Sequence, residues 1–151
     1  MLCLLLIPDG TFARERKSSD DFKPGLVGAV CAGYVYSQSG GMLNCADVQL
    51  GWQFNPYLVV GGSVGNTFTE PFEACGFVSV TADARGILPV GRRVSLFGEA
   101  ALGVGIGYGE DSLVLFHCGP GVRWRSVSFG IFYRQFSDFD NGLLFRVGWH
   151  F

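Results

Sequence analysis

The sequence predicts an all-β fold, an eight-stranded antiparallel up-and-down transmembrane β-barrel. Three observations predict it. Hydrophobic residues make up 48% of the 151 residues and charged residues only 16%, glycine and aromatic residues are abundant, and apolar and polar residues alternate along eight segments. No helix-like run of 18 uncharged apolar residues exists, since Glu99 interrupts the longest candidate, 94–108. In lipid every backbone polar group must bond internally, so a hydrophobic chain without spanning helices is either a β-rich soluble protein or a closed barrel.

Alternation with a period of two defines the predicted strands and gives each strand two faces. In the last strand, every odd position from Leu143 to Phe151 is apolar, whereas the even positions include Arg146 and His150. The other strands divide in the same way, and with these faces no charged side chain lies on an apolar face. The predicted strands are 25–37, 44–54, 58–68, 77–89, 94–108, 113–124, 127–136 and 142–151.

The connections alternate between two kinds. The segments 55–57, 91–93 and 125–126 have the composition of tight hairpin turns. The connections between them are mostly longer and carry acidic residues or glycines; they are 37–43, 69–76, 109–112 and 137–141. Short turns at one rim and longer loops at the other are typical of outer-membrane barrels.

The two faces could be arranged in two ways, with the apolar face inward in a soluble ligand-binding barrel or outward in a membrane barrel. Small residues are frequent on the mixed face, and the only lysines, Lys17 and Lys23, precede the strands. A solvated outer face would carry more lysine, so the apolar face is predicted to contact lipid. Aromatic residues predicted at the membrane interface of the short-turn rim are Trp52, Trp124, Trp149 and Phe151.

The inward face then contains a nearly balanced set of charges. Buried charges are stable only when they are paired and hydrogen-bonded, and the interior of an eight-stranded barrel is just wide enough to be filled by side chains. We therefore expect a structural salt-bridge network in the lumen, the alternative being a narrow ion path or gate. The predicted network is Asp47, Asp83, Arg85, Glu99, Arg123, Arg134 and Arg146.

No motif for catalysis, a cofactor or a metal is evident, and we expect no enzyme activity. His117 lies near Ser112 and Glu110 without a diagnostic spacing, so a hydrogen-bonded lumen histidine is favoured over a catalytic group. The five cysteines contain no Cys-x-x-Cys pair. A Cys31–Cys45 bridge is compatible with their shared face, but unpaired thiols are favoured.

The N-terminal residues are predicted to lie outside the barrel. Residues 1–13 are interpreted as a truncated signal peptide, although the positive segment that begins such signals is missing; the alternative is a disordered tail. Residues 14–24 are predicted to be a linker and 25–151 the barrel domain. The net charge of −2 is too small to indicate nucleic acid or an anionic membrane surface as a partner.

Three segments resemble the small outer-membrane β-barrels of the OmpX and OmpA-barrel type, often grouped as porin-family proteins of Gram-negative bacteria. They are the terminal Leu143–Phe151 strand, the turn 54–57 that leads into a glycine-rich strand, and the segment 119–124. The resemblance implies a monomer in the outer-membrane lipid, inserted by the barrel-insertion machinery through its C-terminal strand. We expect a structural or surface-interaction role, with an unknown extracellular partner; the alternatives are a narrow pore and, less favoured, a lipid-modifying enzyme.

Overall fold

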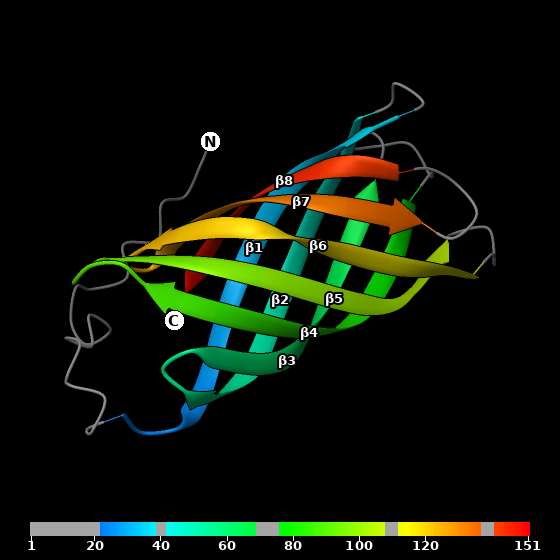
Figure 1. Ribbon diagram of the computed structural model, residues 1–151. Helices are drawn as coiled ribbons and strands as arrows, with labels where there is room; N and C mark the ends of the chain where they lie inside the picture. Colours follow the sequence, from blue (N-terminus) through cyan, green and yellow to red (C-terminus); the bar gives the residue numbers. More distant parts are fainter. Residues whose placement is uncertain (1–21, 39–41, 69–75, 108–111, 137–140) are drawn as a thin grey trace, which may run out of the picture.

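The computed structural model describes residues 22–38, 42–68, 76–107, 112–136 and 141–151. They form a closed barrel in which each strand pairs with its sequence neighbours and β8 pairs with β1 (Figure 1). The predicted all-β fold of eight antiparallel strands is thereby confirmed. The strands are β1 (Gly25–Ser37), β2 (Met42–Asn55), β3 (Leu58–Phe68), β4 (Gly76–Pro89), β5 (Val94–Gly107), β6 (Ser112–Trp124), β7 (Val127–Phe136) and β8 (Asn141–His150).

The strand boundaries lie close to the predicted ones, and the largest difference is at β2, which begins at Met42 rather than at 44. Strand ends are the least defined part of an alternating pattern, because the ladder continues for as long as a neighbour offers backbone partners. No helix within the described ranges is long and apolar enough to cross a membrane. The predicted signal peptide, and residues 14–21 of the predicted linker, lie outside the described residues.

Alternation along the strands gives the barrel an apolar outer face and a filled interior. In β5, for example, Leu96, Leu102 and Val104 are exposed, whereas Phe97 and Glu99 are buried. A closed barrel with this outer face is stable only if lipid, rather than water, surrounds it. Inside, apolar side chains pack into one cluster: Val35, Cys45, Val59, Ile87, Phe97, Leu113, Leu115, Phe132, Phe136 and Leu144.

The short turns share one rim with the C-terminus, and hydrogen bonds link neighbouring turns. The Asn55 side chain accepts a hydrogen bond from the Tyr57 amide at 2.8 Å, which closes the turn between β2 and β3. The Arg125 amide donates to the Arg93 carbonyl at 2.9 Å, joining two adjacent turns. Arg125 has a φ of 54°, in the left-handed region that a side chain with a Cβ seldom adopts.

The cysteines of the strands are unpaired. Cys31 and Cys45 are buried and free, and Cys118 is half-buried and free. Cys31 lies opposite Asp47 in the ladder, while Cys45 lies opposite Gly33, so the two thiols occupy neighbouring rather than facing positions. A Cys31–Cys45 bridge is therefore not formed in this structure.

Candidate functional site

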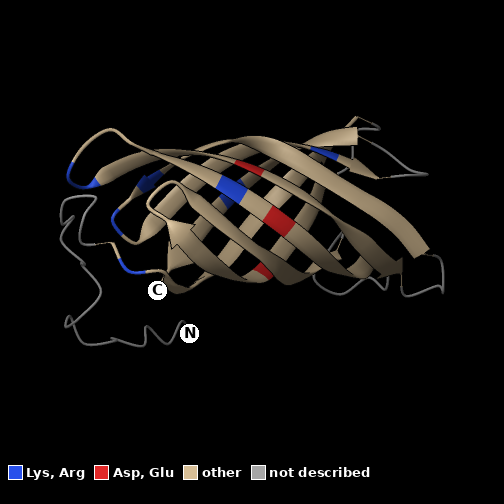
Figure 2. Ribbon diagram, turned by 60° about the horizontal axis from the view of Figure 1, so that its bottom comes forward, with Lys and Arg blue, Asp and Glu red and all other residues tan. Residues whose placement is uncertain are grey.

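Glu99 is the central residue of the polar network in the lumen. It lies on the inward face of β5, and its side chain is completely buried. A buried carboxylate needs several hydrogen-bond donors to compensate for lost hydration. Figure 2 shows charged residues both in the middle of the barrel wall and at the end of the barrel that carries the C-terminus.

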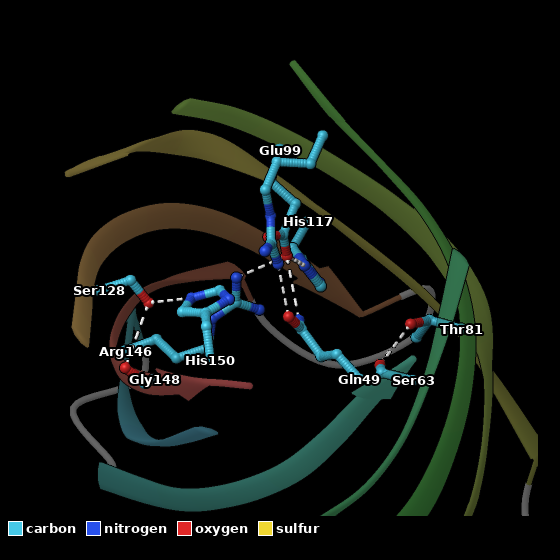
Figure 3. Close-up of polar contacts among 10 residues, drawn as sticks. Gln49, Ser63, Thr81, Glu99, His117, Ser128, Arg146, Gly148 and His150 are labelled. Carbon is cyan, nitrogen blue, oxygen red and sulfur yellow. Dashed lines mark hydrogen bonds and ion pairs between the residues drawn. The ribbon is translucent and has the colours of Figure 1, made fainter. Parts of the chain in front are cut away.

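Four side chains from four different strands bond to Glu99 (Figure 3). Oε2 accepts hydrogen bonds from Arg85 Nε at 2.9 Å and Nη2 at 2.6 Å. Oε1 accepts from Arg146 Nη2 at 2.5 Å, His117 Nε2 at 3.1 Å and Gln49 Nε2 at 3.4 Å. Gln49 also accepts a hydrogen bond from Arg85 through its own carbonyl oxygen, which links the two donors. We call Glu99, Arg85, Arg146, His117 and Gln49 the Glu99 cluster.

Phenylalanine rings cover the arginines of this cluster. The Arg146 guanidinium carbon lies 4.3 Å from the Phe132 ring centroid, and that of Arg85 lies 5.2 Å from the Phe97 centroid. Cation–π contacts of this kind stabilise a guanidinium without using its hydrogen-bond donors. The Glu99 cluster is thus bounded by aromatic side chains and not by open lumen, and Phe132 itself is fully buried.

A second polar region joins the cluster on the side of β2 and β3. Arg134 donates to Thr67 Oγ1 at 3.4 Å, and its guanidinium carbon lies 5.2 Å from the Phe136 ring centroid. A cavity of about 20 Å³ has Asp47, Thr67, Arg134, His117 and Arg146 in its lining. That volume accommodates about one water molecule and no larger solute.

The structure distributes the seven predicted lumen charges unequally. It brings Arg85, Glu99 and Arg146 together in ion pairs. Asp47 Oδ1, Asp83 Oδ2 and Arg134 Nε are buried and have no hydrogen-bond partner in the described structure. Arg123 is half-buried near the short-turn rim, opposite Ser128 in the ladder.

A separate polar pair lies near the end of β8. His150 Nε2 is 2.8 Å from Ser128 Oγ, and the Gly148 carbonyl oxygen lies 3.5 Å from the same hydroxyl (Figure 3). The single hydroxyl proton of Ser128 can be donated to only one of these two acceptors at a time. Ser128 is buried, while His150 is half-buried. His150 lies two residues beyond Gly148, the ladder partner of Ser128, so β7 and β8 position both side chains on the inner face.

Sequence reasoning missed several members of this interior. Strand parity places Gln49 on the same face as Asp47 and places His117 in the lumen, but it does not predict that either side chain bonds to Glu99. Thr67, Phe132 and Phe136 were not singled out either, although strand parity could have placed them inside. Parity could not have shown which residues meet across the lumen, because that depends on the stagger of the closed barrel.

The four predicted interface aromatics lie on the outer face. Trp124 is 57% exposed, and Trp52, Trp149 and Phe151 are exposed to a similar degree. Their strands end at the short turns or at the C-terminus, which places the four residues near the same rim. Among the described residues, no group of three His, Cys, Asp or Glu side chains could hold a metal ion.

Comparisons with known proteins show the fold and no family. No protein-family model matches the sequence, and no curated protein matches it significantly. The structure of the outer membrane enzyme PagL is similar with a TM-score of 0.63 and 16% identity, covering 81% of this chain and 97% of that one. A designed transmembrane β-barrel is similar with a TM-score of 0.52 and 12% identity, covering 91% and 99% of the two chains. A second designed barrel, TMB2.3, has a TM-score of 0.52 and 14% identity, covering 85% and 96%.

The protein has the fold of a small outer-membrane β-barrel, and its outer face is apolar. These similarities support the small eight-stranded barrel class, but they select neither the OmpX nor the OmpA type. They also correct one prediction, that the chain is not an enzyme. This exclusion is wrong, because the barrel of the enzyme PagL is the same fold, and function depends on sites that a fold carries.

Proposed function

We propose that this outer-membrane barrel acts through its surface, with a lumen closed by the Glu99 cluster. The single observation that carries the proposal is the complete burial of the Glu99 side chain among Arg85, Arg146, His117 and Gln49. A conducting pore needs a continuous hydrated path, whereas here donors from four strands converge on one carboxylate.

The packing around the cluster supports the same conclusion. Phe132 and Phe97 cover the two arginines, and the adjoining cavity has room for about one water molecule. An ion that crossed this level would have to break several charge-assisted hydrogen bonds at once, which are about twice as strong as neutral ones. The rims and the outer face are then the surfaces left for interaction.

Single-channel recording in planar lipid bilayers tests the closed lumen. The refolded parent protein is expected to insert without stable unitary conductance steps. A variant that combines Glu99→Ala, Arg85→Ala and Arg146→Ala removes the central side chains and is expected to produce small steps. Folding of both proteins is first verified by the different gel migration of unheated and boiled samples.

The recording also has an outcome that contradicts the proposal. Stable steps from the parent, with an ion selectivity that Glu99→Gln changes, would show that the cluster is a gate in a permeation path. A large-pore porin in the same bilayers serves as the positive control for insertion and detection.

A second candidate function is hydrolysis, and one specific observation favours it. Ser128 and His150 lie within hydrogen-bond distance, the arrangement in which an imidazole removes the proton from a serine nucleophile. The fold is compatible, since PagL is described as an outer membrane enzyme with a similar structure.

Covalent labelling with a fluorophosphonate probe distinguishes this second candidate. A hydrolase is expected to be labelled at Ser128, with labelling abolished in Ser128→Ala and strongly reduced in His150→Ala. Ser63, which shares a 2.7 Å hydrogen bond with Thr81 and has no histidine partner, is the matched control serine. Equal labelling of Ser63→Ala and Ser128→Ala variants would exclude Ser128 as a nucleophile.

A further inference from the structure

Three exposed arginines lie on two adjacent turns of the short-turn rim. Arg92 and Arg93 lie between β4 and β5, and Arg125 lies between β6 and β7. The hydrogen bond from the Arg125 amide to the Arg93 carbonyl, 2.9 Å long, joins the two turns. We call these three residues the arginine patch. In Figure 2, basic segments gather at the end of the barrel that carries the C-terminus.

No acidic residue balances the arginine patch in the segments that surround it. Residues 86–98 and 120–131 contain no Asp or Glu, and within the described residues no ion pair to Arg92, Arg93 or Arg125 is formed. The sequences that connect β3 to β4, β5 to β6 and β7 to β8, namely 69–75, 108–111 and 137–140, contain six acidic residues and no Lys or Arg. The net charge of −2 therefore conceals a separation along the sequence, with basic residues in the short turns and acidic residues in the longer connections.

The arginine patch borders directly on the lipid-facing surface. Val90, Val94 and Trp124 are exposed beside the two turns, and they continue into the apolar outer faces of β4, β5 and β6. The Arg125 guanidinium carbon lies 6.0 Å from the Trp124 ring centroid, so this charge stays at the outer edge of the barrel. An anionic group bound here would have apolar surface immediately above it.

The backbone of Arg125 provides a separate argument. Its φ of 54° is a conformation that glycine or asparagine adopts at lower cost than arginine in two-residue hairpin turns. A residue with a Cβ is a local disadvantage for the turn at such a position, and backbone strain of this kind tends to occur at functional positions. Its placement beside Trp124, at the end of the apolar surface, is consistent with a role at the membrane interface.

We infer that the arginine patch binds the headgroups of anionic phospholipids in the leaflet next to the short turns. The guanidinium groups contact the lipid phosphate, because their planar donor arrangement matches phosphate oxygens. The acyl chains of the same lipid lie along Val90, Val94 and Trp124. Because the arginine patch continues into apolar surface, a phospholipid is favoured as its ligand. A soluble acidic protein or polymer would contact the arginines but would not need the adjoining apolar surface.

Quenching of Trp124 fluorescence by brominated lipids tests the inference. The double variant Trp52→Phe, Trp149→Phe leaves Trp124 as the single tryptophan of the chain. It is refolded into phosphatidylcholine vesicles that contain phosphatidylglycerol, with either lipid brominated at the same mole fraction. Brominated phosphatidylglycerol is expected to be enriched at Trp124 by about fivefold or more, the effect of one arginine near an anionic surface.

Four variants of this single-tryptophan protein separate the effect of charge from an effect on folding. A triple glutamine variant carries Arg92→Gln, Arg93→Gln and Arg125→Gln. It should reduce the enrichment of brominated phosphatidylglycerol to about onefold, whereas the triple variant with lysine at the same positions should retain most of the enrichment. Arg125→Gly should raise the denaturant midpoint by relieving the turn while it lowers the enrichment. Lys23→Gln, a charge outside the patch, is the matched control and should leave the enrichment unchanged.

Two results would overturn the inference. Equal quenching by the two lipids in the parent would leave an acidic protein or polymer as the occupant of the patch. Loss of the preference when inorganic phosphate replaces chloride at the same ionic strength would identify a site for free phosphate. Preference that persists in phosphate and disappears in the triple glutamine variant supports the phospholipid.

Discussion

At Glu99, one carboxylate balances two guanidinium groups, those of Arg85 and Arg146, which form no other ion pair within the described part of the chain. The local arrangement is sensitive to loss of the acid, because Arg85 and Arg146 are both buried. Removing one member of a buried ion pair leaves an uncompensated charge, which costs more than the pair itself contributes.

Glu99→Gln is therefore expected to lower the free energy of unfolding by about 3–5 kcal/mol. Unfolding in urea, followed by tryptophan fluorescence of the barrel refolded in detergent, measures the change. Asp83→Asn is the matched control, since Asp83 is buried on the neighbouring strand but its Oδ2 has no hydrogen-bond partner. Its change should remain within about 1 kcal/mol; equal losses in both variants would contradict the central role of Glu99.

Part of the Glu99 cluster follows from the sequence and part does not. The ladder places Arg85 directly opposite Glu99, which the tight 91–93 turn and the strand parity together made predictable. Arg146 and Gln49 reach Glu99 from strands that are not its neighbours, across the lumen. Such contacts depend on the shear of the closed barrel, which no single strand encodes.

At the scale of the strands, inward glycines allow backbone and side chains to pack closely. A Cβ at Gly119 on β6 would meet the Ile131 carbonyl oxygen and would lie 2.6 Å from the Phe132 Cα. Both atoms belong to the backbone of β7, which cannot move without disturbing its ladder with β6 and β8. Gly98, on the outer face of β5, has nothing within 4 Å of the same position.

We expect Gly119→Ala to lower the free energy of unfolding by about 1–3 kcal/mol, the usual cost of overpacking. Gly98→Ala adds the same methyl group on the neighbouring strand and should change it by less than about 0.5 kcal/mol. The denaturant midpoints of the two variants provide the comparison. A larger loss for Gly98→Ala would mean that the assigned faces are reversed.

Strand parity predicted these elements well for a physical reason. Successive side chains of a strand point to opposite faces, so one face in lipid and one in a packed lumen impose a strict pattern on the sequence. The sequence predicts a mixed inward face with many small residues, and Phe97, Phe132 and Phe136 make a larger part of its core than that pattern indicates. Apolar residues are acceptable on both faces, and their presence alone therefore does not identify the lipid side.

For the whole molecule, the closed barrel predicts a characteristic behaviour in detergent. After refolding, an unheated sample should migrate differently from a boiled one on a denaturing gel, because the barrel resists the detergent until it is heated. The same sample should show a β-sheet circular dichroism spectrum that is lost on boiling. Identical migration of heated and unheated protein, combined with solubility without detergent, would contradict the membrane barrel.

The position of the Glu99 cluster has a kinetic consequence. Its bonds to Gln49 and Arg146 join residues 50 and 47 positions apart in the chain, and they span the lumen. They form only when β2, β5 and β8 have come together, which is late in assembly, since distant segments close at the highest entropic cost. Interactions absent from the transition state act mainly on the rate of unfolding. The cluster thus resembles a latch: it contributes little to how fast the barrel closes and much to how long it stays closed.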